Sequence, residues 1–258
     1  MRLSQAGQHI KNITTNFNRL AYRHDMHMVF EDFLYFGAAA FSNAVDKVNY
    51  DAREKEYLRR MKRYNEDESE LFAVLLAELV MCFEVGGPND YLGLIFMQLN
   101  LGNKFTGQYF TPYDISLLMA QMKFTKEDIE EAIAEKGHIT ISDPCVGAGG
   151  MIIAAYQVIG ELGFNPQQIM RVTTQDVDLR AVLMTYIQST ILNIDNTVIL
   201  GNSLTLECRD VWRTPSRFLR LSAMLSKLSS GKQPTNKNLL ELEDFAKVNE
   251  QGQLTFAI

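Results

Sequence analysis

The stretch HITISDPCVGAGGMIIAAYQVIGEL, residues 138–162, decides the fold class. Its first residues alternate between polar and apolar, as in a half-buried β-strand. A turn with three glycines follows, and then an apolar run with helical spacing. Glycines allow positive φ angles and let a ligand approach the backbone, while the start of the next helix offers free N–H groups. The stretch therefore predicts a strand, a turn suited to ligand binding, and a helix.

Two more strands are predicted after this unit. Residues 171–174 run into QDVD (175–178), and residues 197–200 run into GNSL (201–204), with a helix-like sequence between them. Strands that alternate with helices form parallel sheets with right-handed crossovers. An acid at the end of the second strand fits a site for ribose hydroxyls. The residues alone predict a pocket for a nucleoside-containing cofactor, and tight turns without a ligand are the alternative.

The residues before this sheet are predicted to be helical. Residues 30–45 and 69–85 carry apolar side chains three and four positions apart. Between them lies the charged run DAREKEYLRRMKRYNEDESE, residues 51–70. Its basic side chains are expected either on a solvated helix face or in contact with phosphate: Arg59, Arg60, Lys62 and Arg63.

A further helix is predicted within GQYFTPYDISLLMAQM, residues 107–122. Thr111 has the chemistry of an N-cap, and Pro112 suits the first helical position. Four apolar residues then share one helical face, which is expected to point into the core: Ile115, Leu118, Met119 and Met122.

Composition excludes several classes of protein. The 258 residues are 47% hydrophobic and 22% charged, which is typical of a globular chain and not of a disordered or collagen-like one. No membrane-spanning run or signal peptide is evident, so a cytoplasmic protein is expected. The net charge of −6 disfavours coating of nucleic acid through bulk charge but leaves a local basic patch open. Scattered cysteines and histidines predict no disulfide framework and no metal site.

Four motifs, in this order, resemble those of N6-adenine DNA methyltransferases, and the modification subunit of type I restriction systems is the nearest match. They are GQYFTP (107–112), DPCVGAGG (143–150), QDVD (175–178) and GNSL (201–204). The resemblance covers roughly residues 30–215.

This resemblance implies an α/β fold in three parts. A helical N-terminal region over residues 1–106 precedes a truncated, Rossmann-like S-adenosylmethionine-dependent methyltransferase domain with a parallel sheet over 107–215. A polar tail with a C-terminal strand is expected over 216–258.

The resemblance also implies S-adenosylmethionine as the cofactor. The residues that it assigns to the pocket are Phe110, Thr111 and Pro112 at the methionine end, Asp143, Gly147 and Gly149 in the cofactor loop, Asp176 beside the ribose, and Asn202 beside the adenine. Asn202 stands where the family usually has an Asp, and its amide oxygen keeps the ability to accept a hydrogen bond.

The sequence departs from the family in two ways. The catalytic motif of the family is Asn or Asp followed by two prolines and an aromatic residue, whereas no two of the six prolines here are adjacent. Thr214-Pro215-Ser216 lies near the expected place without supplying that chemistry, so no catalytic residue is assigned. Because 57 residues follow Gly201, the sheet is expected to be shortened, with its first strand at an edge covered by the tail, a helix or another subunit.

Two functional hypotheses remain open. The first is an active DNA adenine-N6 methyltransferase of restriction-modification type, which needs a partner subunit or a second copy to recognise DNA. The second is a catalytically inactive relative that keeps the cofactor pocket and acts as a regulatory or binding module in DNA metabolism or on a mobile element.

Two further patterns concern partners. Arg209, Arg213 and Arg217 recur every four residues and predict a phosphate-facing row if that segment is helical. Residues 253–258 (QLTFAI) resemble a peptide that binds the bacterial sliding clamp.

Overall fold

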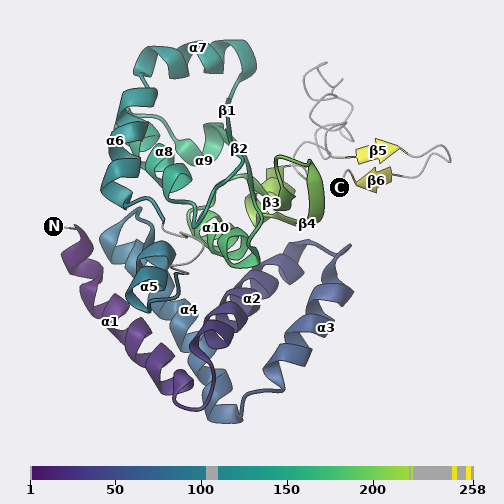
Figure 1. The fold of residues 1–258 in the computed structure, drawn as a ribbon. Coiled ribbons are helices and arrows are strands. Elements are labelled where there is room, and N and C mark those ends of the chain that lie inside the picture. Colours follow the sequence, from purple (N-terminus) through teal and green to yellow (C-terminus); the bar gives the residue numbers. More distant parts are fainter. Residues whose placement is uncertain (1, 103–109, 221, 223–245, 249–253, 257–258) are drawn as a thin grey trace.

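The computed structural model describes residues 2–102, 110–220, 222, 246–248 and 254–256. Five helices come first and gather in the lower half of the view in Figure 1. They are α1 (Arg2–Ala21), α2 (Met26–Val45), α3 (Tyr50–Met61), α4 (Glu66–Gly86) and α5 (Tyr91–Gln98). The predicted helices over 30–45 and 69–85 are confirmed as parts of α2 and α4.

The charged run between α2 and α4 folds back onto a buried carboxylate. Asp32 is fully buried, and its oxygens accept hydrogen bonds from Arg60 Nη1 at 2.8 Å, Arg63 Nη1 at 2.7 Å and the Tyr64 hydroxyl at 2.8 Å. Burial and this last hydrogen bond raise the pKa of Tyr64. A charge is tolerated inside a protein when it is paired in this way. Arg60 is buried in this cluster, so neither alternative from the sequence describes it. Arg59, Lys62 and Arg63 are exposed, as expected for a solvated helix face, although Arg63 also pairs with Asp32.

The α/β part follows and contains most of the predicted elements. Its helices are α6 (Tyr113–Lys123), α7 (Lys126–Lys136), α8 (Gly150–Glu161), α9 (Pro166–Ile169) and α10 (Leu179–Ile191). Its strands are β1 (Ile139–Asp143), β2 (Met170–Asp176), β3 (Asn196–Asn202) and β4 (Glu207–Arg213). The strand, turn and helix predicted over 138–162 are confirmed as β1 and α8.

The strands lie in the order β1-β2-β3-β4, and the first three are parallel as predicted. β4, which the sequence analysis missed, runs antiparallel to β3. The two strands come close enough at Gly201 that a Cβ atom there would collide with the carbonyl oxygen of Glu207. Because β4 reverses direction, the chain returns to the amino edge of the sheet after Arg213.

Within the described ranges, β1 pairs on one side only, with β2. The predicted C-terminal strand exists as β6 (Leu254–Phe256), but it pairs with β5 (Ala246–Val248) in a separate two-stranded sheet. The expectation that this strand covers β1 is therefore wrong. Gln253 and residues 257–258 of the predicted clamp-binding peptide lie outside the described residues.

Helix α10 joins the helical region to the sheet. All nine of its residues from 181 to 189 are buried, and it packs against α2 on one side and β3 on the other. Arg53 of α3 adds a polar link, because its Nη2 donates to the carbonyl oxygen of Val211 on β4 at 2.8 Å. Its guanidinium also lies 4.0 Å from the ring centroid of Trp212 and pairs with Asp46. The helical region thus packs directly against the sheet.

Helix α6 differs from its prediction in its start and in its buried face. It begins at Tyr113 with Pro112 as N-cap and no side-chain capping bond, so Thr111 is not the N-cap. Ser116 and Ala120 are buried instead of the expected stripe, because α6 packs on α8 through small residues. The four apolar residues expected in the core are 48–78% exposed: Ile115, Leu118, Met119 and Met122.

The predicted arginine row is also wrong. The row required one continuous helix, whereas Arg209 and Arg213 lie on β4 and Arg217 lies in the helical residues 215–220. Arg209 donates to the carbonyl oxygen of Val177 at 2.8 Å.

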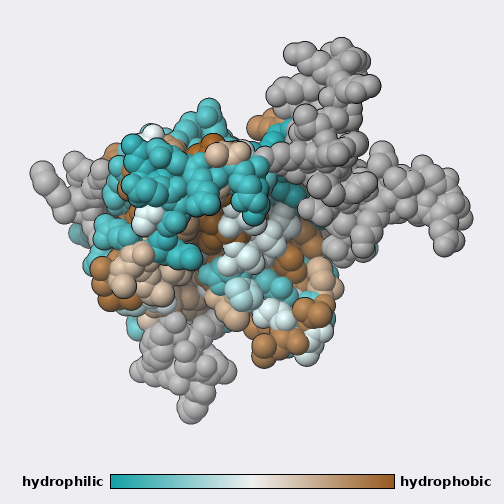
Figure 2. Space-filling view, turned by 90° about the horizontal axis from the view of Figure 1, so that it is seen from above, coloured by the Kyte–Doolittle hydropathy of each residue, from teal (hydrophilic) through white to brown (hydrophobic). Residues whose placement is uncertain are grey.

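None of the helices in the described part of the chain is long and apolar enough to span a membrane. Figure 2 shows the face of the molecule on which α7 lies. This face is largely hydrophilic, with hydrophobic residues at its margins.

Candidate functional site

The glycine turn after β1 is held against the end of β2. Gly147 and Gly149 have φ angles of +59° and +96°, a region that favours glycine. The amide of Gly147 donates to Asp176 Oδ2 at 2.9 Å, and the amide of Val146 donates to the carbonyl oxygen of Gln175 at 3.0 Å. Two motifs that are 29 positions apart in sequence therefore form one surface at the carboxyl edge of the sheet.

Two carboxylates lie on this surface. Asp143 Oδ1 accepts from the amide of Cys145 at 3.0 Å, and Asp176 Oδ1 accepts from the amide of Asp178 at 3.0 Å. Both side chains are partly exposed. An ionised carboxylate has about four acceptor sites, so each keeps capacity for a donor such as an ammonium or a ribose hydroxyl.

Phe110 connects the aromatic-Thr-Pro segment to the glycine turn. Its ring lies 5.0 Å from the ring of Phe96, centroid to centroid. A Cβ atom built on Gly147 would come within 3.0 Å of Phe110 Cδ1. The ring thus occupies the space that the absent side chain of Gly147 leaves. Gly107, Gln108 and Tyr109 of the same motif lie outside the described residues.

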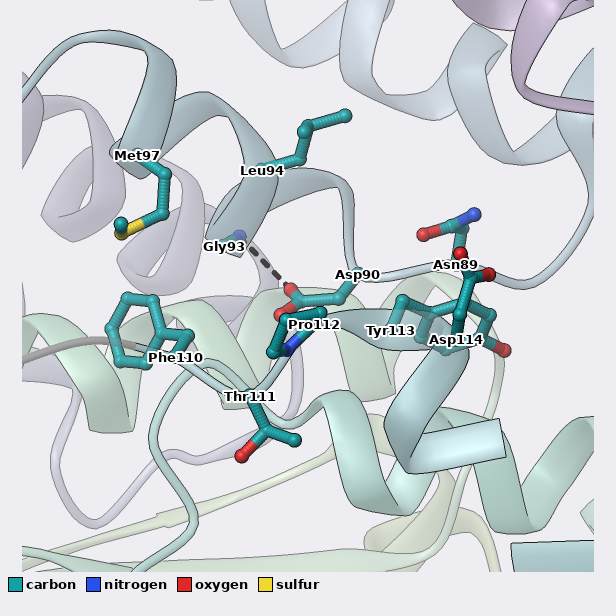
Figure 3. Close-up of a pocket in the computed structure, with 10 residues that line it drawn as sticks. All are labelled: Asn89, Asp90, Gly93, Leu94, Met97, Phe110, Thr111, Pro112, Tyr113 and Asp114. Carbon is teal, nitrogen blue, oxygen red and sulfur yellow. Dashed lines mark hydrogen bonds between the residues drawn. The ribbon is translucent and has the colours of Figure 1, made fainter. Parts of the chain in front are cut away.

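A cavity of about 320 Å³ opens beside this contact. Its walls come from α5, from the turn before α5 and from the start of α6, and its ten lining residues are Asn89, Asp90, Gly93, Leu94, Met97, Phe110, Thr111, Pro112, Tyr113 and Asp114. Figure 3 shows Phe110 and Met97 at one end of the cavity and Asn89 and Asp114 at the other. Apolar walls with a few polar groups are typical of small-molecule sites.

Asn202 ends β3 on the same edge of the sheet as Asp176. Its Oδ1 accepts from the amide of Leu204 at 2.9 Å, which shapes the exposed turn into β4. The contact of Asn202 with the adenine of the cofactor stays a prediction.

The family model described as N-6 DNA Methylase matches residues 91–217, the segment that holds the cavity and the glycine turn. This segment is therefore similar to that methylase family. No curated protein matches the chain.

Two solved structures are similar to this chain at 14% identity. One is a type I restriction-modification methyltransferase subunit from Streptococcus thermophilus, with a TM-score of 0.40 over 78% of this chain and 59% of that one. The other, from Listeria monocytogenes, is described as a class I S-adenosylmethionine-dependent methyltransferase, with a TM-score of 0.39 over 72% of this chain and 57% of that one. This chain spans less than two thirds of the length of either of those two chains.

Asp90 and Gln188 link the cavity to the glycine turn, and the sequence analysis assigned neither of them to the candidate site. Asp90 is buried, and its Oδ1 accepts from the amide of Gly93 at 2.9 Å and from Gln188 Nε2 at 2.8 Å. Gln188 Nε2 also donates to the carbonyl oxygen of Ala148 at 2.8 Å. Burial raises the pKa of Asp90. A glutamine in the buried middle of α10 was the sequence signal for this bridge between α5 and the glycine turn.

Thr214-Pro215-Ser216 lies at the amino edge of the sheet. The Thr214 hydroxyl donates to the carbonyl oxygen of Ile194 at 2.7 Å and accepts from the amide of Asn196 at 3.0 Å. Both partners lie at the amino end of β3, so this tripeptide faces away from the glycine turn. The described residues contain no group of three or more metal-binding side chains.

Proposed function

We propose that this chain binds S-adenosylmethionine at the carboxyl edge of β1, β2 and β3 and forms the cofactor-binding part of a DNA adenine-N6 methyltransferase. The observation that carries the proposal is the hydrogen bond from the Gly147 amide to Asp176. It joins a positive-φ glycine turn to a strand-end carboxylate, which is the arrangement that a bound nucleoside needs.

The chemistry of the site fits this cofactor. Asp176 has acceptor capacity for the ribose hydroxyls, and Asp143 has capacity for the ammonium group. Asn202 offers an amide for the adenine. The cofactor also carries a positive sulfonium, and two carboxylates, Asp90 and Asp114, line the adjacent cavity. Phe110, Thr111 and Pro112 give this cavity the wall expected beside the methionine end.

In this proposal, another chain binds the target adenine. The sequence lacks the double-proline motif, and Thr214-Pro215-Ser216 lies at the opposite edge of the sheet. A partner subunit or a second copy is therefore proposed to supply the base-binding residues and DNA recognition, in a cytoplasmic restriction-modification setting. The same observations favour a second candidate, a non-catalytic relative that binds the cofactor and acts as a regulatory module.

Calorimetric titration with S-adenosylmethionine tests the binding step. We expect wild-type protein to bind and Asp143→Asn and Asp176→Asn to lose at least tenfold in affinity, because each loses a charge that faces the cofactor. The matched control is Asp67→Asn, an exposed side chain on α4, which should bind as wild type. Equal binding by all four proteins would refute the assigned pocket, and so would absence of binding by folded wild type.

Transfer of labelled methyl groups to unmethylated duplex DNA separates the two candidates. Label that enters adenine with wild type but not with Asp143→Asn supports the methyltransferase. Cofactor binding without transfer to DNA supports the regulatory module.

A further inference from the structure

Four aspartates are buried in the part of the chain that the structure describes, and three of them pair with an arginine. These three pairs are Asp32 with Arg60, Asp46 with Arg53, and Asp195 with Arg220. The fourth aspartate, Asp90, is 6% exposed and forms no ion pair with a described residue. A buried carboxylate that carries its charge needs a cation or several hydrogen bonds. Asp90 differs from the other three because the described residues give it no cation.

The hydrogen bonds of Asp90 use one of its two oxygens. Its Oδ1 accepts from the amide of Gly93 and from Gln188 Nε2, and both donors are neutral groups. Its Oδ2 accepts no hydrogen bond from the described residues. A Cβ atom on Gly93 would collide with Oδ2, and one on Gly150 would lie 3.3 Å from it. The two glycines therefore leave room for this oxygen where α5 meets the start of α8.

Asp90 also lines the cavity of about 320 Å³. Figure 3 shows its carboxylate at the centre of the residues that line this cavity. None of the described lining residues is a lysine, an arginine or a histidine, and the second carboxylate, Asp114, is exposed. Phe110 and Tyr113 add aromatic rings to the wall, and aromatic faces attract cations. The lining of the cavity therefore favours a positively charged group.

We propose that Asp90 makes this cavity selective for a ligand that carries a positive charge. The ligand supplies the cation that an arginine supplies to each of the other buried aspartates. Burial raises the pKa of Asp90, and a cation in the cavity favours its charged form. The identity of the cation rests on the proposed function: it is the sulfonium of S-adenosylmethionine. Asp90 thus distinguishes the methyl donor from S-adenosylhomocysteine, whose thioether is neutral.

Calorimetric titration of the full chain with three ligands tests this selectivity. They are S-adenosylmethionine, neutral S-adenosylhomocysteine, and sinefungin, in which a carbon with a protonated amine replaces the sulfonium. Asp90→Asn removes the charge and keeps an oxygen that can accept both hydrogen bonds. We expect this variant to bind the two cationic ligands roughly tenfold more weakly and S-adenosylhomocysteine less than about twofold more weakly.

Asp25→Asn is the matched control, because Asp25 caps α2 as Asp90 caps α5 and does not line the cavity. It should leave all three affinities unchanged. If folded Asp90→Asn weakens the three ligands equally, or weakens none, the proposal is overturned and the proposed function stands. If folded wild type binds none of the three, the proposed function is refuted, and the sulfonium is refuted with it as the ligand of this cavity.

Thermal unfolding of the free proteins separates the charge of Asp90 from its hydrogen bonds. Asp90→Asn removes a buried charge that has no cation, so the free variant should melt at or above the temperature of wild type. Asp90→Ala removes both hydrogen bonds and should melt lower and bind all three ligands more weakly. If Asp90→Asn melts lower than Asp25→Asn, the charge serves the fold and the proposal is overturned.

Discussion

Two carboxylates, Asp32 in the helical region and Asp176 at the edge of the sheet, show how differently this chain uses the same side chain. Asp32 is fully buried, and its oxygens accept from two arginines and a tyrosine. Asp176 is partly exposed, and the hydrogen bonds described above come to it from the backbone amides of Gly147 and Asp178. The first is saturated by side chains and holds the fold together. The second is oriented by the backbone and keeps acceptor capacity for a ligand.

The largest expected effect is on stability in the helical region. Asp32→Ala leaves Arg60 and Arg63 without their shared buried partner, and we expect it to lower the free energy of unfolding by about 3–5 kcal/mol. Urea denaturation followed by circular dichroism measures this. Asp67→Ala, on the exposed first turn of α4, is the control and should change stability by about 0.5 kcal/mol. If Asp32→Ala lowered the free energy of unfolding by less than about 1 kcal/mol, Asp32 would not hold the fold together, and its contrast with Asp176 would be wrong.

A smaller effect on stability, with a large effect on binding, is expected in the glycine turn. Gly149→Ala puts a side chain at φ +96° and a Cβ atom 3.0 Å from Thr185 Oγ1. We expect a cost of about 1–2 kcal/mol in unfolding free energy and at least tenfold weaker binding of S-adenosylmethionine.

Gly160→Ala is the matched control on the following helix. Outside its own helix backbone and chain neighbours, no atom lies within 4 Å of its added Cβ, and Gly160 lies in the last turn of α8, so this variant should keep its stability and bind normally. Weak binding by Gly160→Ala, or normal binding by Gly149→Ala, would show that the turn does not hold the cofactor.

The smallest effect concerns acid stability. The hydrogen bond from Arg59, with a further one from Arg60, lowers the pKa of Glu56 from 4.5 to about 2. A lowered pKa in the folded state adds stability that is present above pH 4.5 and is lost as the pH falls toward 2. Glu56→Gln should flatten the dependence of unfolding free energy on pH in this window and leave it unchanged in shape above pH 6. An unchanged slope between pH 4.5 and 2 would contradict the assignment.

The sequence predicted the fold where pattern and topology agree. Residues 138–202 alternate between strand and helix, so parallel pairing of β1, β2 and β3 followed from local signals. The sequence analysis missed β4 because four of the residues in Glu207–Arg213 are charged. Such a run is as typical of a helix face or a loop as of a strand. The apolar stripe on α6 was wrongly predicted to be buried, because α6 packs through the small side chains Ser116 and Ala120. The spacing of apolar residues predicts a helix but does not show which of its faces another element covers.

The candidate site was predictable to the level of strand ends. Parallel strands bring their carboxyl ends to one edge, which placed Asp143, Asp176 and Asn202 together. The contact of Phe110 with Gly147 depends on how distant segments pack, and a single sequence holds no signal for that. Gln188 stands out in the sequence as a polar residue within an apolar helix, but the sequence does not identify Asp90 as its partner.

Trp212 is the only tryptophan in the sequence, and it lies where the helical region meets the sheet. It is buried between the rings of Tyr35 on α2 and Tyr186 on α10, with the guanidinium of Arg53 over its face. Indole emission depends on polarity and on nearby charge. The tryptophan emission of this chain is therefore specific to that junction, and it will report any ligand or partner that moves α2 or α3 relative to β4.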